Sequence, residues 1–133
     1  MIRRINHIGI AVKNLEQARD FYGSVFKLES SAPLIERDFR VSMMQIGDIK
    51  IELMEPLGSE GVIARFLEKR GEGIHHICFE VDDIGSALAS IEVKGVELLN
   101  REPQPGAEGK IAFLHSRTAH GVLIELVEVE SDT

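Results

Sequence analysis

Residues 74–87 read IHHICFEVDDIGSA, and residues 5–18 read INHIGIAVKNLEQA. When His7 is aligned with His76, a shift of 69 positions, most apolar residues of one segment meet apolar residues of the other. Self-similarity of this kind is typical of a structural unit that has been duplicated. The pattern therefore predicts a chain made of two similar halves.

The ends of the two halves match as well. Residues 49–55 read IKIELME and residues 122–128 read VLIELVE, which aligns Glu52 with Glu125 at a shift of 73. The difference between the two shifts requires only a few extra loop residues in the second half. Each half therefore carries a histidine near its start and a glutamate near its end, at matched places.

Each half is predicted to contain a strand, a helix and three further strands, from apolar residues that alternate or follow helical spacing. Asn14 is expected to cap the first helix, and Asp82 or Asp83 the second. Gly47-Asp48 indicates a tight hairpin. The expected strands lie near residues 5–12, 28–35, 39–46 and 49–55 in the first half, and near 74–81, 96–101, 110–115 and 121–129 in the second.

These elements predict an α+β fold, in which two βαβββ modules form a curved mixed sheet around a metal site. A single domain is expected over residues 1–133. Its first module is expected at about 1–56, a linker helix at about 59–71 and the second module at about 73–129.

Four polar residues are expected on the strand faces that point away from the helices. Side chains alternate along a strand, so the apolar residues of each strand share one face and the polar residue lies on the other. These residues are His7, Glu52, His76 and Glu125. If the two halves curve toward each other, the four side chains enter one trough. Two imidazoles and two carboxylates suit a divalent ion such as zinc, nickel, cobalt, iron or manganese.

Other interpretations exist for each histidine and for the cysteine. Any one ligand candidate alone would be an ordinary core or solvated residue, and only the recurrence in both halves favours a metal site. His75 competes with His76, but strand parity places it on the apolar face. Cys78 shares the face of His76 and could be a fifth ligand, but we interpret it as a small residue that lines the trough. His115 and His120 have no repeat partner and are expected at the surface.

Composition excludes several classes of protein. The formal net charge of −7 argues against a general nucleic-acid binder. No apolar run approaches the roughly 18 residues that a membrane span needs, and the N-terminus lacks the apolar stretch of a secretory signal. Cys78 is the only cysteine, so an internal disulfide is impossible. We expect a cytoplasmic protein that binds neither nucleic acid nor membrane.

At these residues the sequence resembles the vicinal oxygen chelate superfamily, whose domains pair two βαβββ modules around a metal ion. Within it, the chain is similar to the methylmalonyl-CoA epimerase family over nearly its whole length. The segments that carry this resemblance are NHIGIAV (6–12), KIELMEP (50–56), IARFLEKRGEGIHHICFEVDDI (63–84), EPQPGAEGKIAFLH (102–115) and GVLIELVE (121–128). Two departures are visible: Glu52 stands where some epimerases have glutamine, and Ser116 where the family often has proline.

The resemblance implies a metal-dependent epimerase that interconverts (R)- and (S)-methylmalonyl-CoA by 1,1-proton transfer through a metal-stabilised enolate. It implies His7, Glu52, His76 and Glu125 as ligands of one divalent metal ion. Cobalt is the expected metal, and zinc, nickel, manganese and iron are the alternatives. Glu125 is the first candidate for the catalytic base, and Glu52 is the second by pseudosymmetry. Another glutamate that serves as a base in some family members falls near Val41 here and is not carried over.

The resemblance also implies partners, which are an acyl-CoA substrate and a second copy of the chain in a homodimer. Two other functions stay open. One is a glyoxalase I-like lactoylglutathione lyase, because Glu52 resembles the ligand set of that enzyme. The other is a non-catalytic small-molecule binding protein of the same fold.

Overall fold

The computed structural model describes residues 1–130 and divides the chain into two compact units. We call residues 7–75 the N-terminal unit, and residues 1–6 together with those from His76 onward the C-terminal unit. The single domain expected over residues 1–133 extends beyond the described residues and stays a prediction.

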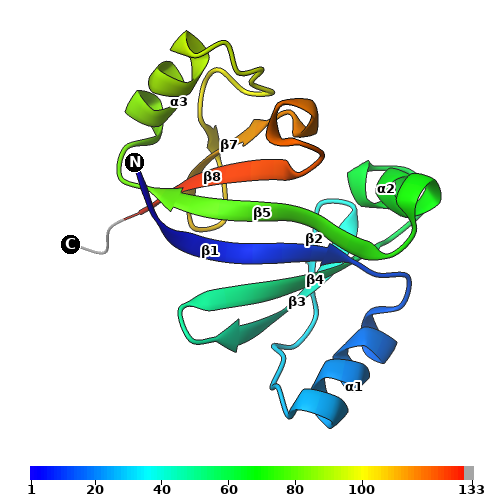
Figure 1. Cartoon of the computed structure of the whole chain (residues 1–133). Coiled ribbons are helices and arrows are strands. Elements are labelled where there is room, and N and C mark those ends of the chain that lie inside the picture. Colours follow the sequence, from blue (N-terminus) through cyan, green and yellow to red (C-terminus); the bar gives the residue numbers. More distant parts are fainter. Residues whose placement is uncertain (131–133) are drawn as a thin grey trace. The chain divides into compact units, whose positions relative to one another are not determined.

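The N-terminal unit follows the predicted order of strand, helix and three strands. Its elements are β1 (Ile2–Ala11, whose first residues belong to the C-terminal unit), α1 (Leu15–Phe26), β2 (Leu34–Glu36), β3 (Phe39–Ile46), β4 (Ile49–Pro56) and α2 (Val62–Arg70). The strands lie in the order β2-β3-β4-β1, in which β1 is parallel to β4 and the other neighbours are antiparallel. Helix α1 packs against β3 and β4 (Figure 1).

The C-terminal unit repeats this order. Its elements are β5 (Gly73–Val81, whose first residues belong to the N-terminal unit), α3 (Ile84–Val93), β6 (Gln104–Pro105), β7 (Gly109–Leu114), the 3-10 helix η1 (Ser116–Ala119) and β8 (Leu123–Val129). The strands lie in the order β5-β8-β7-β6, in which only β5 and β8 are parallel. Helix α3 packs against β7 and β8 (Figure 1). Two βαβββ modules are therefore present, which confirms the predicted fold class.

Equivalent side chains begin the two module helices. The carboxamide Oδ1 of Asn14 accepts a hydrogen bond from the Gln17 backbone N–H at 2.9 Å. In the second module, Asp83 Oδ1 accepts from the Ser86 N–H at 3.0 Å, so Asp83 rather than Asp82 is the N-cap. Each cap satisfies one of the N–H groups that the first helical turn leaves without a partner.

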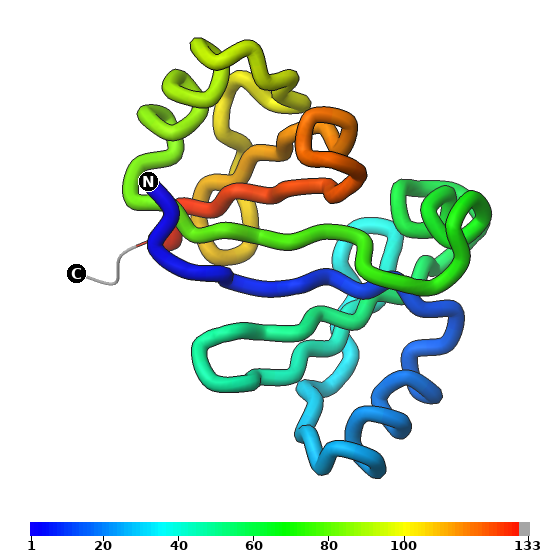
Figure 2. Tube along the Cα trace, viewed as in Figure 1, coloured from blue at the N-terminus to red at the C-terminus, as the bar shows by residue number. Residues whose placement is uncertain are grey.

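The hairpin between β3 and β4 turns where the sequence predicts it. Ile46 pairs with Ile49, and Gly47 has φ of 59° in the two-residue turn. Figure 2 shows the chain reversing tightly between β3 and β4. This left-handed conformation carries little steric cost for glycine. The turn fixes the register of β3 on β4, which holds Glu52.

Two predicted strands are wrong over most of their length. In segment 28–35, only Leu34 and Ile35 fall in a strand, and Ser30 forms an isolated bridge to Met44. The hydroxyl oxygen of Ser31 accepts from the Met43 N–H at 2.9 Å and so replaces a strand carbonyl. A side chain thus satisfies a donor that a regular ladder would use.

Segment 96–101 shows the same departure in the second module. It forms only an isolated bridge between Leu98 and Leu114, and the second strand of this module is the short β6 instead. Here the Asn100 side chain accepts from the Phe113 N–H at 2.9 Å. Asparagine competes with ladder pairing through its own hydrogen bonds, as serine does in the first module.

Apolar side chains between each helix and its strands form the core. The buried clusters are Val12, Leu15, Met44 and Leu53; Ala11, Val41, Met54 and Ile63; and Val81, Ile84, Ala87, Leu88, Ala112, Leu114 and Leu126. Burial of each large apolar side chain contributes about 1.5–3 kcal/mol. Because Leu53 and Met54 are neighbours on β4 and point to opposite faces, these contacts hold α1 on one face of the N-terminal strands and α2 on the other, and they hold α3 on β7 and β8. Among residues 1–130, no helix is long and apolar enough to cross a bilayer.

Candidate functional site

The first candidate pair lies on two parallel neighbouring strands of the N-terminal unit. β1 and β4 pair with His7 opposite Lys50 and Gly9 opposite Glu52. Residues two apart share a strand face, and so do residues directly opposite each other. His7 and Glu52 therefore point to the same face, and His7 Nε2 lies 3.7 Å from Glu52 Oε2.

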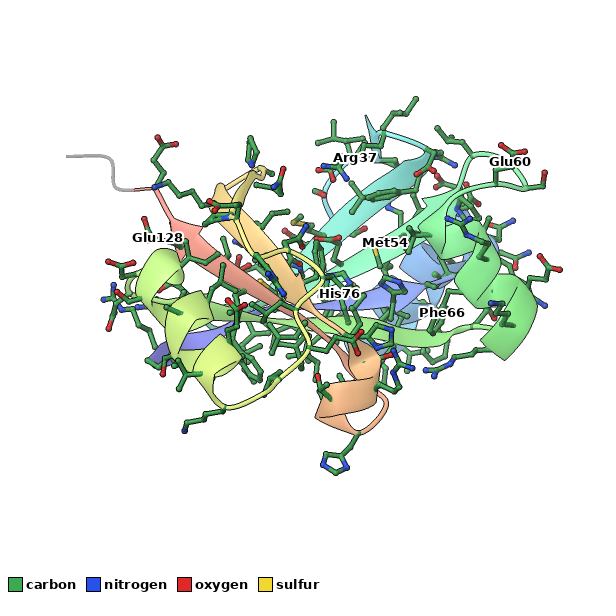
Figure 3. The ribbon with its side chains drawn as sticks, turned by 90° about the horizontal axis from the view of Figure 1, so that it is seen from above. Arg37, Met54, Glu60, Phe66, His76 and Glu128 are labelled. Carbon is green, nitrogen blue, oxygen red and sulfur yellow. The ribbon has the colours of Figure 1, made fainter. Side chains whose placement is uncertain are left out.

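The second candidate pair repeats this arrangement in the C-terminal unit. β5 and β8 pair with His76 opposite Leu123 and Cys78 opposite Glu125. In both units the glutamate stands opposite the residue that follows the histidine by two positions. His76, labelled on β5 in Figure 3, has its Nε2 atom 3.2 Å from Glu125 Oε1. The structure thus brings His7 to Glu52 and His76 to Glu125.

All four side chains are withdrawn from solvent. His7 and Glu52 each expose 11% of their side chains, and His76 and Glu125 expose 7% and 11%. Glutamate is rarely buried to this extent without a partner. A buried carboxylate is costly unless it is hydrogen-bonded, paired or bound to a metal. Two buried imidazole–carboxylate pairs are therefore unusual features of so small a chain.

The spacing within each pair fits two ligands of one ion. Metal–nitrogen and metal–oxygen bonds of about 2.0–2.2 Å, at angles between octahedral and tetrahedral, put neighbouring donor atoms about 2.8–3.6 Å apart. The separation of 3.2 Å in the second pair lies within this range, and the separation of 3.7 Å in the first pair lies just above it. The longer one exceeds a hydrogen bond, so it suits donors that share an ion better than donors bonded to each other. The residues present therefore fit a divalent metal.

Small and apolar residues surround each pair. Glu52 stands opposite Gly9 on one side and Met43 on the other. Glu125 stands equivalently between Cys78 and Phe113. Cys78 is fully buried, which agrees with a small lining residue. Sequence reasoning assigned no role to Met43 and Phe113, because cross-strand partners depend on register, which neighbouring residues alone do not reveal.

The remaining histidines have other surroundings. The His75 ring meets the Phe66 ring edge-to-face at a centroid distance of 5.0 Å. Phe66 lies on α2 (Figure 3). His115 Nδ1 accepts from the Arg117 N–H at 3.0 Å and so caps η1. His120 is exposed and has a left-handed backbone with φ of 57°.

Sequence reasoning also missed two glutamates that bind helix N-termini. Glu55 accepts from the Leu15 N–H at 3.0 Å, and Glu128 accepts from the Ile84 N–H at 2.9 Å. The available signal was their position, since each follows a candidate ligand glutamate by three residues in matched segments.

A charged network lies beside Glu55 in the N-terminal unit. The Arg40 guanidinium donates to Glu16 at 2.9 Å and to Glu55 at 3.0 Å. The Arg40 hydrogen bond, aided by one from Arg19, holds the pKa of the Glu16 carboxyl below its ordinary value. The same carboxylates raise the pKa of Arg40, Glu16 more than Glu55.

Comparison with known proteins places this arrangement in a family. The model of the Glyoxalase/Bleomycin resistance protein/Dioxygenase superfamily matches residues 6–113. Ethylmalonyl-CoA/methylmalonyl-CoA epimerase of Cereibacter sphaeroides is 44% identical over 134 residues, which cover 97% of this chain and 100% of that protein. Mitochondrial methylmalonyl-CoA epimerase of Homo sapiens is 41% identical over 127 residues, which cover 92% of this chain and 72% of that one.

A solved structure agrees with these sequence matches. A variant of Streptomyces coelicolor methylmalonyl-CoA epimerase, in complex with 2-nitronate-propionyl-CoA, is similar with a TM-score of 0.89 at 36% identity. The similarity covers 98% of this chain and 99% of that chain. This chain therefore belongs to the Glyoxalase/Bleomycin resistance protein/Dioxygenase superfamily and, within it, to the methylmalonyl-CoA epimerase family.

Proposed function

We propose that this protein interconverts (R)- and (S)-methylmalonyl-CoA, and that His7, Glu52, His76 and Glu125 hold one divalent metal ion for this reaction. The observation that carries the proposal is the 44% identity, over the full length of the relative, to an epimerase whose name includes methylmalonyl-CoA. The two buried histidine–glutamate pairs support the metal site. Cobalt is the first candidate ion, and zinc, nickel, manganese and iron suit the same donors.

The chemistry begins with a proton that is hard to remove. Epimerisation breaks the C2–H bond between the thioester and the carboxylate, leaves an enolate, and forms a new C–H bond on the opposite face. A bound divalent ion would stabilise the negative charge that develops on the oxygens beside C2. No atom is gained or lost overall, because one proton leaves C2 and one returns.

The two glutamates supply a carboxylate for each face of C2. We assign Glu125 as the base that removes the proton from one stereoisomer, and Glu52 as its counterpart for the other. Each presents one oxygen to its histidine, at 3.2 Å for Glu125 and 3.7 Å for Glu52, and a carboxylate has a second oxygen that can take a proton. Their burial limits competition from bulk water and strengthens electrostatic interactions in the site.

Hydrogen exchange at C2 tests both the reaction and the bases. The cobalt-loaded protein should exchange the C2 hydrogen of methylmalonyl-CoA in deuterated water and invert the centre, and chelation should stop both. Glu125→Gln and Glu52→Gln should each slow epimerisation by about 10²–10⁴-fold. A variant that lacks one base can still exchange one stereoisomer on the intact face, so each should show exchange of that isomer without inversion.

Controls separate loss of a base from loss of the metal. The metal content and thermal melting of each variant are measured on the same preparation, and rates are compared at saturating cobalt. Full exchange of both stereoisomers by Glu125→Gln would reject its role as a base. No exchange by the folded, metal-loaded wild-type protein would reject the epimerase function itself.

A lactoylglutathione lyase is the alternative enzyme. It has less support, because the relatives compared above are named as epimerases. An assay of the glutathione hemithioacetal on the same preparation separates the two activities. Metal content separates either enzyme from a non-catalytic binding protein.

We also propose a homodimer that acts in the cytoplasm, in propionate metabolism. Phe21, Val25 and Phe26 on α1 each expose more than half of their surface, and apolar surface of this kind favours association. A chain whose single cysteine, Cys78, cannot form an internal disulfide suits a reducing compartment. Light scattering on the purified protein measures the oligomeric state.

A further inference from the structure

Each proposed ligand glutamate is followed by a second glutamate at the same spacing. Glu55 lies three residues after Glu52, and Glu128 lies three residues after Glu125. Because side chains alternate along a strand, an odd spacing turns the second glutamate away from the ligand face. It therefore points to the face on which the module helix packs.

Both second glutamates bind the first residue of a helix. The Leu15 N–H, at the start of α1, donates to Glu55 Oε2 at 3.0 Å. The Ile84 N–H, at the start of α3, donates to Glu128 Oε1 at 2.9 Å. Figure 3 labels Glu128 on β8, near α3. The first N–H groups of a helix have no partner within it, and a carboxylate there also favours the helix dipole.

In each unit, this bond connects the strand that carries the ligand glutamate to the helix that follows the strand of the ligand histidine. α1 directly follows β1, which carries His7, and Glu55 lies on β4, which carries Glu52. The last ladder bond of this pair runs from the Val12 N–H to the Met54 carbonyl at 2.9 Å, just before the Glu55 contact. The bond to Leu15 therefore closes the end of the β1–β4 pair.

The C-terminal unit has the same connection. α3 follows β5, which carries His76, and Glu128 lies on β8, which carries Glu125. A slip of one residue in either pair would turn the ligand glutamate to the opposite face of its strand. A bond that fixes the end of the pair opposes such a slip, and it also limits smaller shifts along the strand.

Arg40 strengthens the connection in the N-terminal unit. Its Nη1 atom donates to Glu55 Oε1 at 3.0 Å, while Leu15 occupies Oε2. Both oxygens of Glu55 are therefore held, one by a cation and one by the helix. Glu55 is partly buried, with 19% of its side chain exposed, so its orientation is restricted by packing as well.

We propose that Glu55 and Glu128 are positioning residues, which hold each histidine–glutamate pair in the register needed to bind the metal. The proposal rests on the proposed metal site. It assigns the two residues no contact with substrate or ion, because both lie on the helix face of their strands.

Cobalt affinity at a temperature well below melting tests this role. Glu55→Ala and Glu128→Ala remove the acceptor and should each weaken cobalt binding by about 10–100-fold, as is usual for residues that orient ligands. Glu55→Gln and Glu128→Gln keep an acceptor oxygen at the same reach and should bind cobalt nearly as the wild type does. The matched control is Glu16→Gln, which removes the charge of the other carboxylate that Arg40 contacts, leaves the Glu55 bond, and should not change the affinity.

The outcomes separate this proposal from the metal site itself. If the alanine variants melt at lower temperature but bind cobalt as tightly as the wild type, the glutamates only stabilise the fold and the proposal is overturned. If an alanine variant does not fold, Glu→Asp at the same position withdraws the carboxylate by one methylene and should weaken cobalt binding. Undiminished affinity of the aspartate variant would then overturn the proposal. A wild-type protein that binds no cobalt would overturn the metal site as well.

Discussion

The neighbouring histidines of β5 offer a sharp test, because a single step along the strand separates two different roles. His76 Nε2 lies 3.2 Å from Glu125, whereas the His75 ring packs edge-to-face on Phe66. We predict that His76→Ala removes metal-induced stabilisation, and that His75→Ala leaves it intact. Each variant serves as the matched control for the other, since both replace a histidine of the same strand by alanine.

The expected changes in Tm follow from the linkage between metal binding and folding. At a free cobalt concentration 100 times the dissociation constant, binding stabilises the folded protein by about 2.7 kcal/mol. For a chain of 133 residues this corresponds to a rise in Tm of about 8–13 °C. Loss of the His76 imidazole, a proposed ligand, should weaken binding at least as much as loss of a residue that only orients a ligand, which is about a hundredfold at the upper end. The same concentration then gives at most about 0.4 kcal/mol, or a rise of no more than about 1–2 °C.

His75→Ala should change the metal-free protein instead. Loss of the aromatic contact with Phe66, whose planes meet at 81°, should cost about 0.5–1.5 kcal/mol. The metal-free Tm should therefore fall by about 2–7 °C, and the cobalt-induced rise should equal that of the wild type. Differential scanning fluorimetry with and without cobalt measures both quantities. A full cobalt-induced rise in His76→Ala, or its loss in His75→Ala, would show that strand parity had assigned the wrong imidazole.

Three further predictions concern stability. Leu15, the first residue of α1, is fully buried, so Leu15→Ala should lower the free energy of unfolding by about 3 kcal/mol, measured by urea denaturation. Gly109→Ala should cost about 2 kcal/mol or more, because φ is 154° and the new Cβ would collide with the Glu128 carbonyl; an unchanged urea midpoint would contradict this. Because Arg40 lowers the folded-state pKa of Glu16, the stability that Glu16 contributes is present at neutral pH and is lost as the pH falls through that pKa. The stability difference between wild type and Glu16→Gln should therefore disappear in acid, and a difference that persists there would refute the electrostatic origin.

The duplicated pattern predicted the elements that depend on local sequence. Asn14 and Asp83 cap their helices, and the Gly47 turn forms where expected, because each of these features is set by a few neighbouring residues. The two βαβββ modules follow from the same signals. Strand parity also predicted the face of each candidate ligand, and within each unit the expected histidine and glutamate lie together.

The failures have a common physical cause. Segments 28–35 and 96–101 have strand-like composition, but Ser31 and Asn100 offer side-chain acceptors that compete with a backbone ladder. Whether such a side chain meets a backbone N–H depends on the strand beside it, which the local sequence does not encode. Register has the same nonlocal origin, so the partners of Glu52 and Glu125 became known only from the structure.

The two closing strands share the same spacing between two glutamates, which is three residues in each. A residue three positions after a ligand lies on the opposite face, so one short segment can serve the site with its first glutamate and the helix with its second. Glu52 with Glu55, and Glu125 with Glu128, divide the two tasks in this way. Insertion or deletion of one residue between the two glutamates would end this division, since an even spacing turns both side chains to one face. The E-x-x-E spacing therefore lets each closing strand place one glutamate beside its histidine and the other at the start of its module helix.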